Sequence, residues 1–120
     1  MKEAVDVKNL PKGGPYSHAN VIKDLIFVSG QSGQILGKEI TFNEQFNNTM
    51  NKIESILSSC GSSMQNIVKI SVYLSSSDYF KNMNDLFSKY FPEKPPARTT
   101  LVTGFVSSEI KVEVDVIAFR

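Results

Sequence analysis

The segment TFNEQFNNTMNKIESILSSCG, residues 41–61, has the pattern of an amphipathic helix with a signal at each end. Thr41 followed by Glu44 is a capping box, in which each side chain bonds to the backbone of the other residue. Apolar residues then recur every three or four positions and form one stripe: Phe46, Met50, Ile53, Leu57 and Cys60. Gly61 stands where a left-handed residue ends many helices. The segment therefore predicts a helix that buries one face.

Segments on both sides of this helix alternate apolar and polar residues, which is typical of strands with one buried face. The expected strands are residues 3–7, 19–22, 25–29, 68–74, 98–102 and 110–118. A tight turn at Lys23-Asp24 joins the second and third strands into a hairpin. The glycines at positions 30, 33 and 37 predict an irregular connection from this hairpin to the helix.

A second helix is expected between Ser75-Ser76-Ser77-Asp78, which can cap it, and Pro92, which ends it. The apolar residues expected on its buried side are Phe80, Met83, Phe87, Tyr90 and Phe91. One apolar face on every helix and strand predicts an α+β fold, with both helices on one side of an antiparallel or mixed sheet. The opposite sheet face carries polar and apolar residues together, so either water or another copy of the chain could cover it.

The length and composition fit a single domain, residues 1–120. The net charge of +1, without a cluster of basic residues, argues against a nucleic-acid partner. Cys60 is the only cysteine, so no disulfide can form within the chain. The start MKEAVDV has no apolar signal segment, and no apolar run is long enough for a bilayer. We therefore expect a cytoplasmic protein without a membrane partner.

The residue types exclude several kinds of catalytic site. One histidine and one cysteine cannot form the usual zinc site. The chain has no Gly-x-Ser-x-Gly motif for a serine hydrolase, and its glycines do not lead into the Lys-Ser/Thr of a phosphate loop. These patterns therefore argue against metal, nucleotide and acyl-enzyme chemistry.

Four polar residues remain as candidates for a site: Arg98, Glu113, Tyr16 and Asn84. Arg98 follows two prolines at the start of a strand, where its planar guanidinium could bind a carboxylate, although the local pattern alone favours an ordinary surface arginine. Glu113 lies among valines, either solvated on the open face or in a cleft where burial would raise its pKa toward a value useful for proton transfer. Tyr16 and Asn84 also fit packing and solvent-facing roles.

Six segments together resemble the Rid/YjgF family, which is also called endoribonuclease L-PSP or translation inhibitor. They are GPYSHA (14–19), LIFVSGQ (25–31), GSSMQNIVK (61–69), MNDLFSKYF (83–91), PARTT (96–100) and KVEVDVIA (111–118). The segments span nearly the whole chain and keep the order of the family. No segment is specific by itself, but the combination is.

The resemblance implies a chorismate-mutase-like α+β fold, with a mixed, mostly antiparallel sheet and two helices packed on one face. It also implies a homotrimer whose active sites lie in clefts between subunits, and a final strand in the middle of the sheet. Arg98 and Glu113 then need not be neighbours in one chain, and could meet across a subunit boundary.

The activity that the resemblance implies is cofactor-independent hydrolysis of reactive enamines and imines to 2-keto acids and ammonium. The substrates are 2-aminoacrylate, 2-iminopropanoate and 2-iminobutanoate, which pyridoxal-phosphate enzymes such as serine/threonine dehydratases release. By resemblance, Arg98 would bind the substrate carboxylate. Glu113 would orient a water molecule and carry its proton, with Tyr16 lining the same cleft as a third catalytic residue. The other expected substrate-binding residues are Ser29, Gly30, Asn84 and Thr100.

Three positions depart from the family pattern. The loop after Gln31 is a few residues shorter than usual, Thr100 stands where many members have cysteine, and His18 replaces a common glutamine. These changes keep Arg98 and Glu113 but could reshape the pocket. Two other functions remain open: an endoribonuclease or translation inhibitor that acts on single-stranded RNA, and a non-catalytic trimer that binds small carboxylates.

Overall fold

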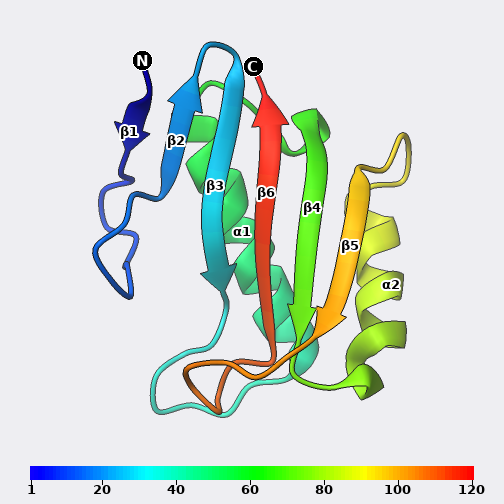
Figure 1. Ribbon diagram of the computed structural model, residues 1–120. Helices are drawn as coiled ribbons and strands as arrows, with labels where there is room; N and C mark the ends of the chain where they lie inside the picture. Colours follow the sequence, from blue (N-terminus) through cyan, green and yellow to red (C-terminus); the bar gives the residue numbers. More distant parts are fainter.

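The computed structural model describes residues 1–120 and contains one six-stranded sheet and two α-helices (Figure 1). The elements, with η for short 3₁₀ turns, are β1 (Glu3–Val5), β2 (Ala19–Ile22), β3 (Leu25–Ser32), α1 (Phe42–Ser59), η1 (Met64–Asn66), β4 (Ile67–Leu74), η2 (Ser77–Tyr79), α2 (Phe80–Tyr90), β5 (Ala97–Val102) and β6 (Val112–Phe119). The strand order is β1-β2-β3-β6-β4-β5, and only β4 and β5 run parallel. The prediction of a mixed, mostly antiparallel sheet is confirmed.

Both helices lie on one face of the sheet, behind it in Figure 1. On β6, the side chains that point toward the helices are at most 2% exposed: Val112, Val114, Val116 and Ala118. The apolar stripe of α1 joins these valines in one hydrophobic core. We call the other side, which carries Glu113, Asp115 and Tyr73, the open face. The α+β fold with two helices on one face is therefore confirmed, and the last strand lies inside the sheet.

Helix α1 has the two end structures that its sequence predicts, with one difference. The Thr41 hydroxyl accepts a bond from the Glu44 backbone N–H at 3.1 Å, but Glu44 makes no return bond, so only half of the capping box forms. At the other end Gly61 has φ +77°, and the N–H groups of Gly61 and Ser62 donate to the carbonyls of Ser58 and Leu57. This is a Schellman ending. Neither α1 nor α2 combines the length and the apolar character needed to cross a membrane.

Helix α2 begins later than its capping serines suggest. The Ser76 hydroxyl accepts a bond from the Asp78 N–H at 3.1 Å and starts the turn η2, which then leads into the helix at Phe80. The prediction that Phe80 points inward is wrong, because its side chain is 46% exposed. The helix lies beside the edge strand β5, where its first turn has little sheet to cover (Figure 1). Met83 and Phe87 are buried as expected.

Strand β3 extends three residues beyond the expected end at Ser29. A register shift between Val28 and Gln31 forms a bulge, after which Gln31 pairs with Val114 and Ser32 pairs with Glu113 of β6. The predicted irregular stretch therefore begins as a bulge within the strand. Smaller differences are that β1 ends at Val5, that β5 begins one residue early and that β6 begins at Val112.

Gln45 ties α1 to the segment that leads into β6. Its side chain is 2% exposed, its amide donates to the Glu109 carbonyl at 2.8 Å, and its amide oxygen accepts from the Lys111 N–H at 2.9 Å. Both bonds join residues more than sixty positions apart in the chain. A single buried amide therefore helps to set where β6 enters the sheet.

We predict that Gln45→Leu lowers the free energy of unfolding by about 2 to 4 kcal/mol, because two backbone groups lose their partners at a buried position. Chemical denaturation followed by circular dichroism measures this change. Ser55→Ala, at an exposed position of the same helix, is the matched control and is expected to change the stability little. Equal stabilities for the two variants would contradict the role of Gln45.

Candidate functional site

Three of the expected site residues, Tyr16, Gly30 and Glu113, line one cavity of about 660 Å³ beside β3. The cavity exists because β2 pairs with β3 only as far as Val28, so the edge of β3 from Gly30 to Ser32 has no strand beside it. The segment from Pro11 to Tyr16 forms another part of the wall. The strand edge, the loop and the open face of β6 therefore meet at this cavity.

Gly30 allows the Glu113 side chain to lie directly against the backbone of β3. A Cβ atom at position 30 would come within 2.5 Å of the Glu113 Oε2 atom and 3.0 Å of its carboxyl carbon. Real Cβ contacts are not this short, so any larger residue would displace the carboxylate. The glycine thus places the carboxyl group beside the unpaired strand edge.

The surroundings of Glu113 favour its protonated form. The side chain is half-buried, and burial is the larger cause that raises the pKa of its carboxyl group; the nearby Asp115 is the second cause. No lysine or arginine of the same chain lies within 4.0 Å to offset these effects. Asp115 also raises the pKa of the Tyr73 hydroxyl. The open face therefore gathers acidic groups without a basic partner.

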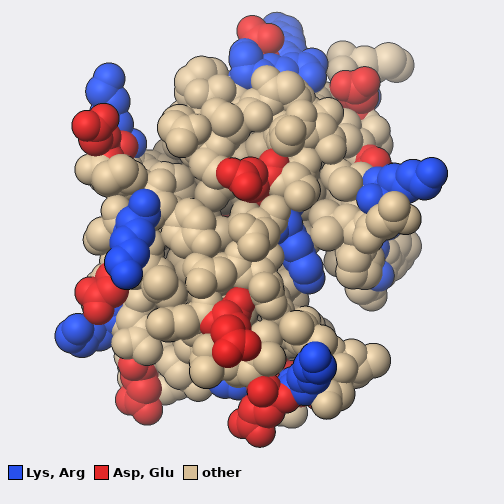
Figure 2. Space-filling view, turned by 180° about the vertical axis from the view of Figure 1, so that it is seen from behind, with Lys and Arg blue, Asp and Glu red and all other residues tan.

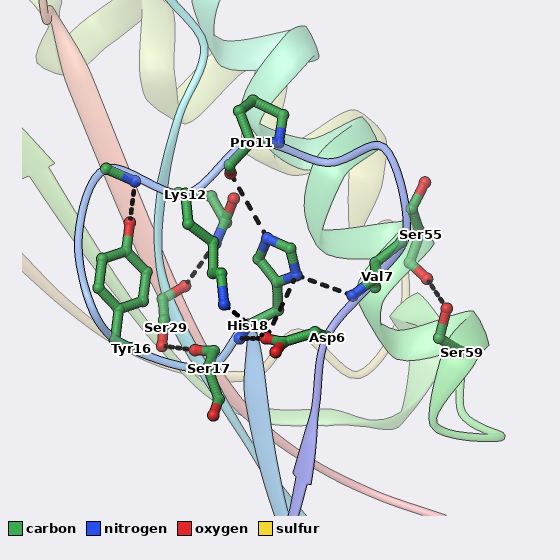
Figure 3. A network of polar contacts seen from close by, with 12 residues as sticks. Asp6, Val7, Pro11, Lys12, Tyr16, Ser17, His18, Ser29, Ser55 and Ser59 are labelled. Atoms are coloured by element: carbon green, nitrogen blue, oxygen red, sulfur yellow. Dashed lines mark hydrogen bonds and ion pairs between the residues drawn. The ribbon is translucent and has the colours of Figure 1, made fainter.

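A polar network fixes the loop that carries Tyr16 (Figure 3). The Tyr16 hydroxyl accepts a bond from the Gly13 N–H at 2.9 Å, and its own proton remains available for donation. The Ser29 hydroxyl donates to the Ser17 carbonyl at 2.6 Å. Ser29, an expected substrate-binding residue, therefore holds the loop against β3 in this chain.

His18 anchors the other side of the same loop and was not among the expected site residues. Its side chain is 1% exposed, and Nδ1 accepts a bond from the Val7 N–H at 2.8 Å. The backbone N–H of His18 donates to the Asp6 carboxylate, which also pairs with Lys12 at 3.1 Å (Figure 3). The only sequence signal for this role is that the sole histidine lies between a loop and a strand.

Arg98 lies away from Glu113, on the other face of the sheet. Arg98 pairs with Ile70 and Glu113 pairs with Tyr73, and adjacent residues of β4 point to opposite faces. The Arg98 Cζ atom lies 4.8 Å from the centre of the Phe87 ring, and Nη1 lies 3.5 Å from the sulfur of Met83. Burial lowers the pKa of the guanidinium, and no carboxylate of the chain pairs with it.

Two other expected residues belong to the Arg98 side. Thr100 follows Arg98 by two positions on the same face of β5, and its buried hydroxyl has no hydrogen-bond partner in the chain. Asn84 is half-buried on α2, next to Met83. One chain therefore holds two separate sets: Tyr16, Ser29, Gly30 and Glu113 on one side, and Asn84, Arg98 and Thr100 on the other.

A comparison with protein families identifies the family of the chain. The family model described as endoribonuclease L-PSP matches residues 6–120. The chain belongs to this family. Its relatives include a RutC family protein of Pyrococcus horikoshii, which is 31% identical and aligns over 100% of this chain and 99% of the relative.

Other relatives carry the Rid name. A chloroplastic protein of Arabidopsis thaliana named Reactive Intermediate Deaminase A is 32% identical over 98% of this chain and 65% of that protein. The solved structure of a member of the conserved Rid protein family from Yersinia pestis has a TM-score of 0.89 and 26% identity, with 100% of both chains covered. The resemblance to the Rid/YjgF family is therefore confirmed, together with its fold.

The raised pKa of Glu113 predicts a pH dependence of stability. A carboxyl group whose pKa is raised by folding stabilises the native state most below its unfolded pKa, and this contribution is lost as the pH rises through the folded pKa. The Glu113→Gln variant has no carboxyl group to ionise at this position, so its stability does not fall in this way as the pH rises. The variant should therefore gain stability relative to the unmodified protein between about pH 4 and pH 7.

Denaturant unfolding across this pH range measures the difference between the two proteins. Glu93→Gln, at an exposed position outside the cavity, is the control for removal of a surface charge. A difference between Glu113→Gln and the unmodified protein that stays constant with pH would show that burial does not shift the Glu113 carboxyl group.

Proposed function

We propose that the protein hydrolyses reactive 2-imino and 2-enamino acids to 2-keto acids and ammonium without a cofactor. The substrates of this proposal are 2-aminoacrylate, 2-iminopropanoate and 2-iminobutanoate. The observation that carries it is the position of the Glu113 carboxyl group, which lies against Gly30 in the cavity. Its surroundings there raise its pKa. A relative named Reactive Intermediate Deaminase A supports the reaction class.

The chemistry needs only a positioned water molecule and a group that moves protons. The carbon of a protonated C=N bond is already electrophilic, so Glu113 as carboxylate takes a proton while the water oxygen bonds to this carbon. The resulting carbinolamine collapses after Glu113 returns this proton to nitrogen: the C–N bond breaks, a C=O bond forms, and Glu113 takes the hydroxyl proton, which the departing ammonia then accepts to become ammonium. Water and iminium thus become a 2-keto acid and ammonium. A raised pKa suits Glu113 to these transfers.

The carboxylate of the substrate requires a cation, and we assign this role to Arg98 of a second copy of the chain. Within one chain Arg98 and Glu113 lie on opposite faces, so a single copy cannot place both on one small substrate. Arg98 has no acidic partner and Glu113 has no basic partner. A contact between the Arg98 side of one copy and the Glu113 side of the next would join these complementary charges.

The open face has the surface that such a contact needs. It exposes large apolar side chains that are between 41% and 52% accessible: Ile22, Leu25, Phe27, Leu101 and Phe119. A sheet face of this kind is commonly covered by a partner. Because the contact joins two different surfaces, it forms a closed ring when the rotation from one copy to the next is a whole fraction of a turn. We propose the homotrimer that the family resemblance implies, with the active sites at the subunit interfaces.

The remaining site residues take supporting roles in this proposal. Tyr16 can donate its hydroxyl proton toward the reacting nitrogen, and the backbone of Gly30 can hydrogen-bond the substrate. Ser29 positions the Tyr16 loop through Ser17. From the second copy, the unpartnered Thr100 hydroxyl and the half-buried Asn84 would complete the wall around the bound carboxylate.

The family description as endoribonuclease does not find support in the surface or the site. The helix-covered side, seen in Figure 2, shows basic and acidic side chains scattered without a large basic patch. The sole histidine is 1% exposed and bonded to the backbone of the N-terminal segment, so it cannot reach an RNA substrate as a base. Neither feature favours RNA cleavage.

A dehydratase that releases 2-aminoacrylate tests the proposed reaction. Pyruvate formation should accelerate when the protein is added, and Arg98→Ala should lower this acceleration by about a hundredfold or more, because the substrate loses its bidentate carboxylate contact. The matched control is Arg120→Ala, which removes the only other arginine of the chain. Full acceleration by the Arg98 variant would refute the assignment.

Mixing two inactive variants tests the shared site. Arg98→Ala and Glu113→Gln, unfolded together at equal amounts and refolded, should regain about one quarter of the original activity, since a random trimer forms that share of sites with both residues intact. Each variant refolded alone is the control. Absence of any recovery, in a mixture shown by light scattering to be trimeric, would place Arg98 outside the Glu113 site.

A further inference from the structure

Lys52 is a cation in the Glu113 cavity that the proposed reaction leaves without a role. It belongs to α1, and its side chain lines the cavity together with Tyr16, Gly30 and Glu113. The side chain is half-buried, and burial lowers the pKa of its ammonium group. No carboxylate lies within 4.0 Å. The cavity therefore contains a partly desolvated positive charge that makes no ion pair with the two glutamates of its wall, Glu109 and Glu113.

The ammonium group of Lys52 is held at one place on the cavity wall. Its Nζ atom donates to the Ser32 carbonyl at 2.7 Å, and Ser32 pairs directly with Glu113 across the strands. An ammonium group has three N–H donors, and this bond uses one of them. The other lysine of the cavity, Lys12, is paired with Asp6 at 3.1 Å. Lys52 is thus the cation of the cavity that has free donors.

A structural role alone does not require a charge at this position. Asn48, one helical turn before Lys52, donates its side-chain amide to the Gly33 carbonyl at 3.0 Å and so ties α1 to the same segment without charge. A cation that is buried without an anion costs free energy, whereas an amide at position 52 would avoid this cost. The charge is explained if an anion enters the cavity with the ligand.

We propose that Lys52 binds a second carboxylate of the substrate, so that the preferred substrates are 2-imino dicarboxylates. This inference rests on the proposed function, in which Arg98 of another copy binds the carboxylate next to the C=N bond. Arg98 offers a planar fork for that fixed group, while Lys52 offers a point charge on a flexible stem that suits the more mobile distal carboxylate. Glu113 has the same role, proton transfer at the C=N carbon, for substrates with one or two carboxylates.

The ratio of kcat/KM for two imines tests the proposal. 2-Iminosuccinate and 2-iminopropanoate are formed in situ by oxidases acting on aspartate and alanine, and their loss is followed by trapping with semicarbazide. We expect the dicarboxylate to be preferred about tenfold or more, and Lys52→Gln to lower this ratio about tenfold. Lys52→Arg should keep most of the preference. Lys12→Gln is the matched control for loss of a cavity lysine and should keep the ratio.

The outcomes separate this inference from the proposed function. Suppose that both imines are hydrolysed and that Lys52→Gln leaves the ratio of their kcat/KM values unchanged, or lowers both kcat/KM values equally. Lys52 then does not bind a second carboxylate, and the inference is overturned while the proposed reaction stands. If neither imine is hydrolysed, the proposed function fails. Calorimetric binding of succinate and butanoate then decides whether Lys52 forms an anion site. Preferential succinate binding that Lys52→Gln removes supports the anion site, and equal binding overturns it.

Discussion

Strand β6 is hydrogen-bonded on both edges, to β3 on one side and to β4 on the other, so the alternation of its side chains is imposed on the whole sheet. Its valines face the helices and complete the core, which leaves Glu113 and Asp115 on the open face. A shift of one residue would exchange the two sets and bury both acids. The position of the acidic groups is therefore a consequence of the same pairing that stabilises the fold.

The site depends on two exceptions to this regular pairing. The bulge in β3 places Gly30 against the Glu113 side chain, and the early end of β2 leaves the adjacent strand edge unpaired. The carboxyl group is thereby held between a bare backbone and a loop, where it loses much of its water. The cation that would complement it, Arg98, belongs to the other face of the edge strand β5. In the proposed site, a single copy of the chain therefore supplies two unlike halves.

Alternation of residue type was enough to predict the strands, the helices and their arrangement in layers, because each pattern has one buried face. It could not predict that Arg98 and Glu113 lie on opposite faces, since this depends on strand order and register between distant segments. The bulge at Gly30 and the exposure of Phe80 are tertiary effects of the same kind. Lys52 left a weak signal that was missed: a lysine directly beside Ile53 of the buried stripe.

The central place of β6 also bears on how the protein folds during synthesis. This strand follows the other five in the chain, yet it is the one that joins β1-β2-β3 to β4-β5. Until β6 leaves the ribosome, the inner edges of β3 and β4 have no partner and α1 has only part of its packing surface. The nascent chain thus carries the open edge of β3 from early in translation and that of β4 from residue 74 onward, and the cooperative core can form only after β6 has emerged.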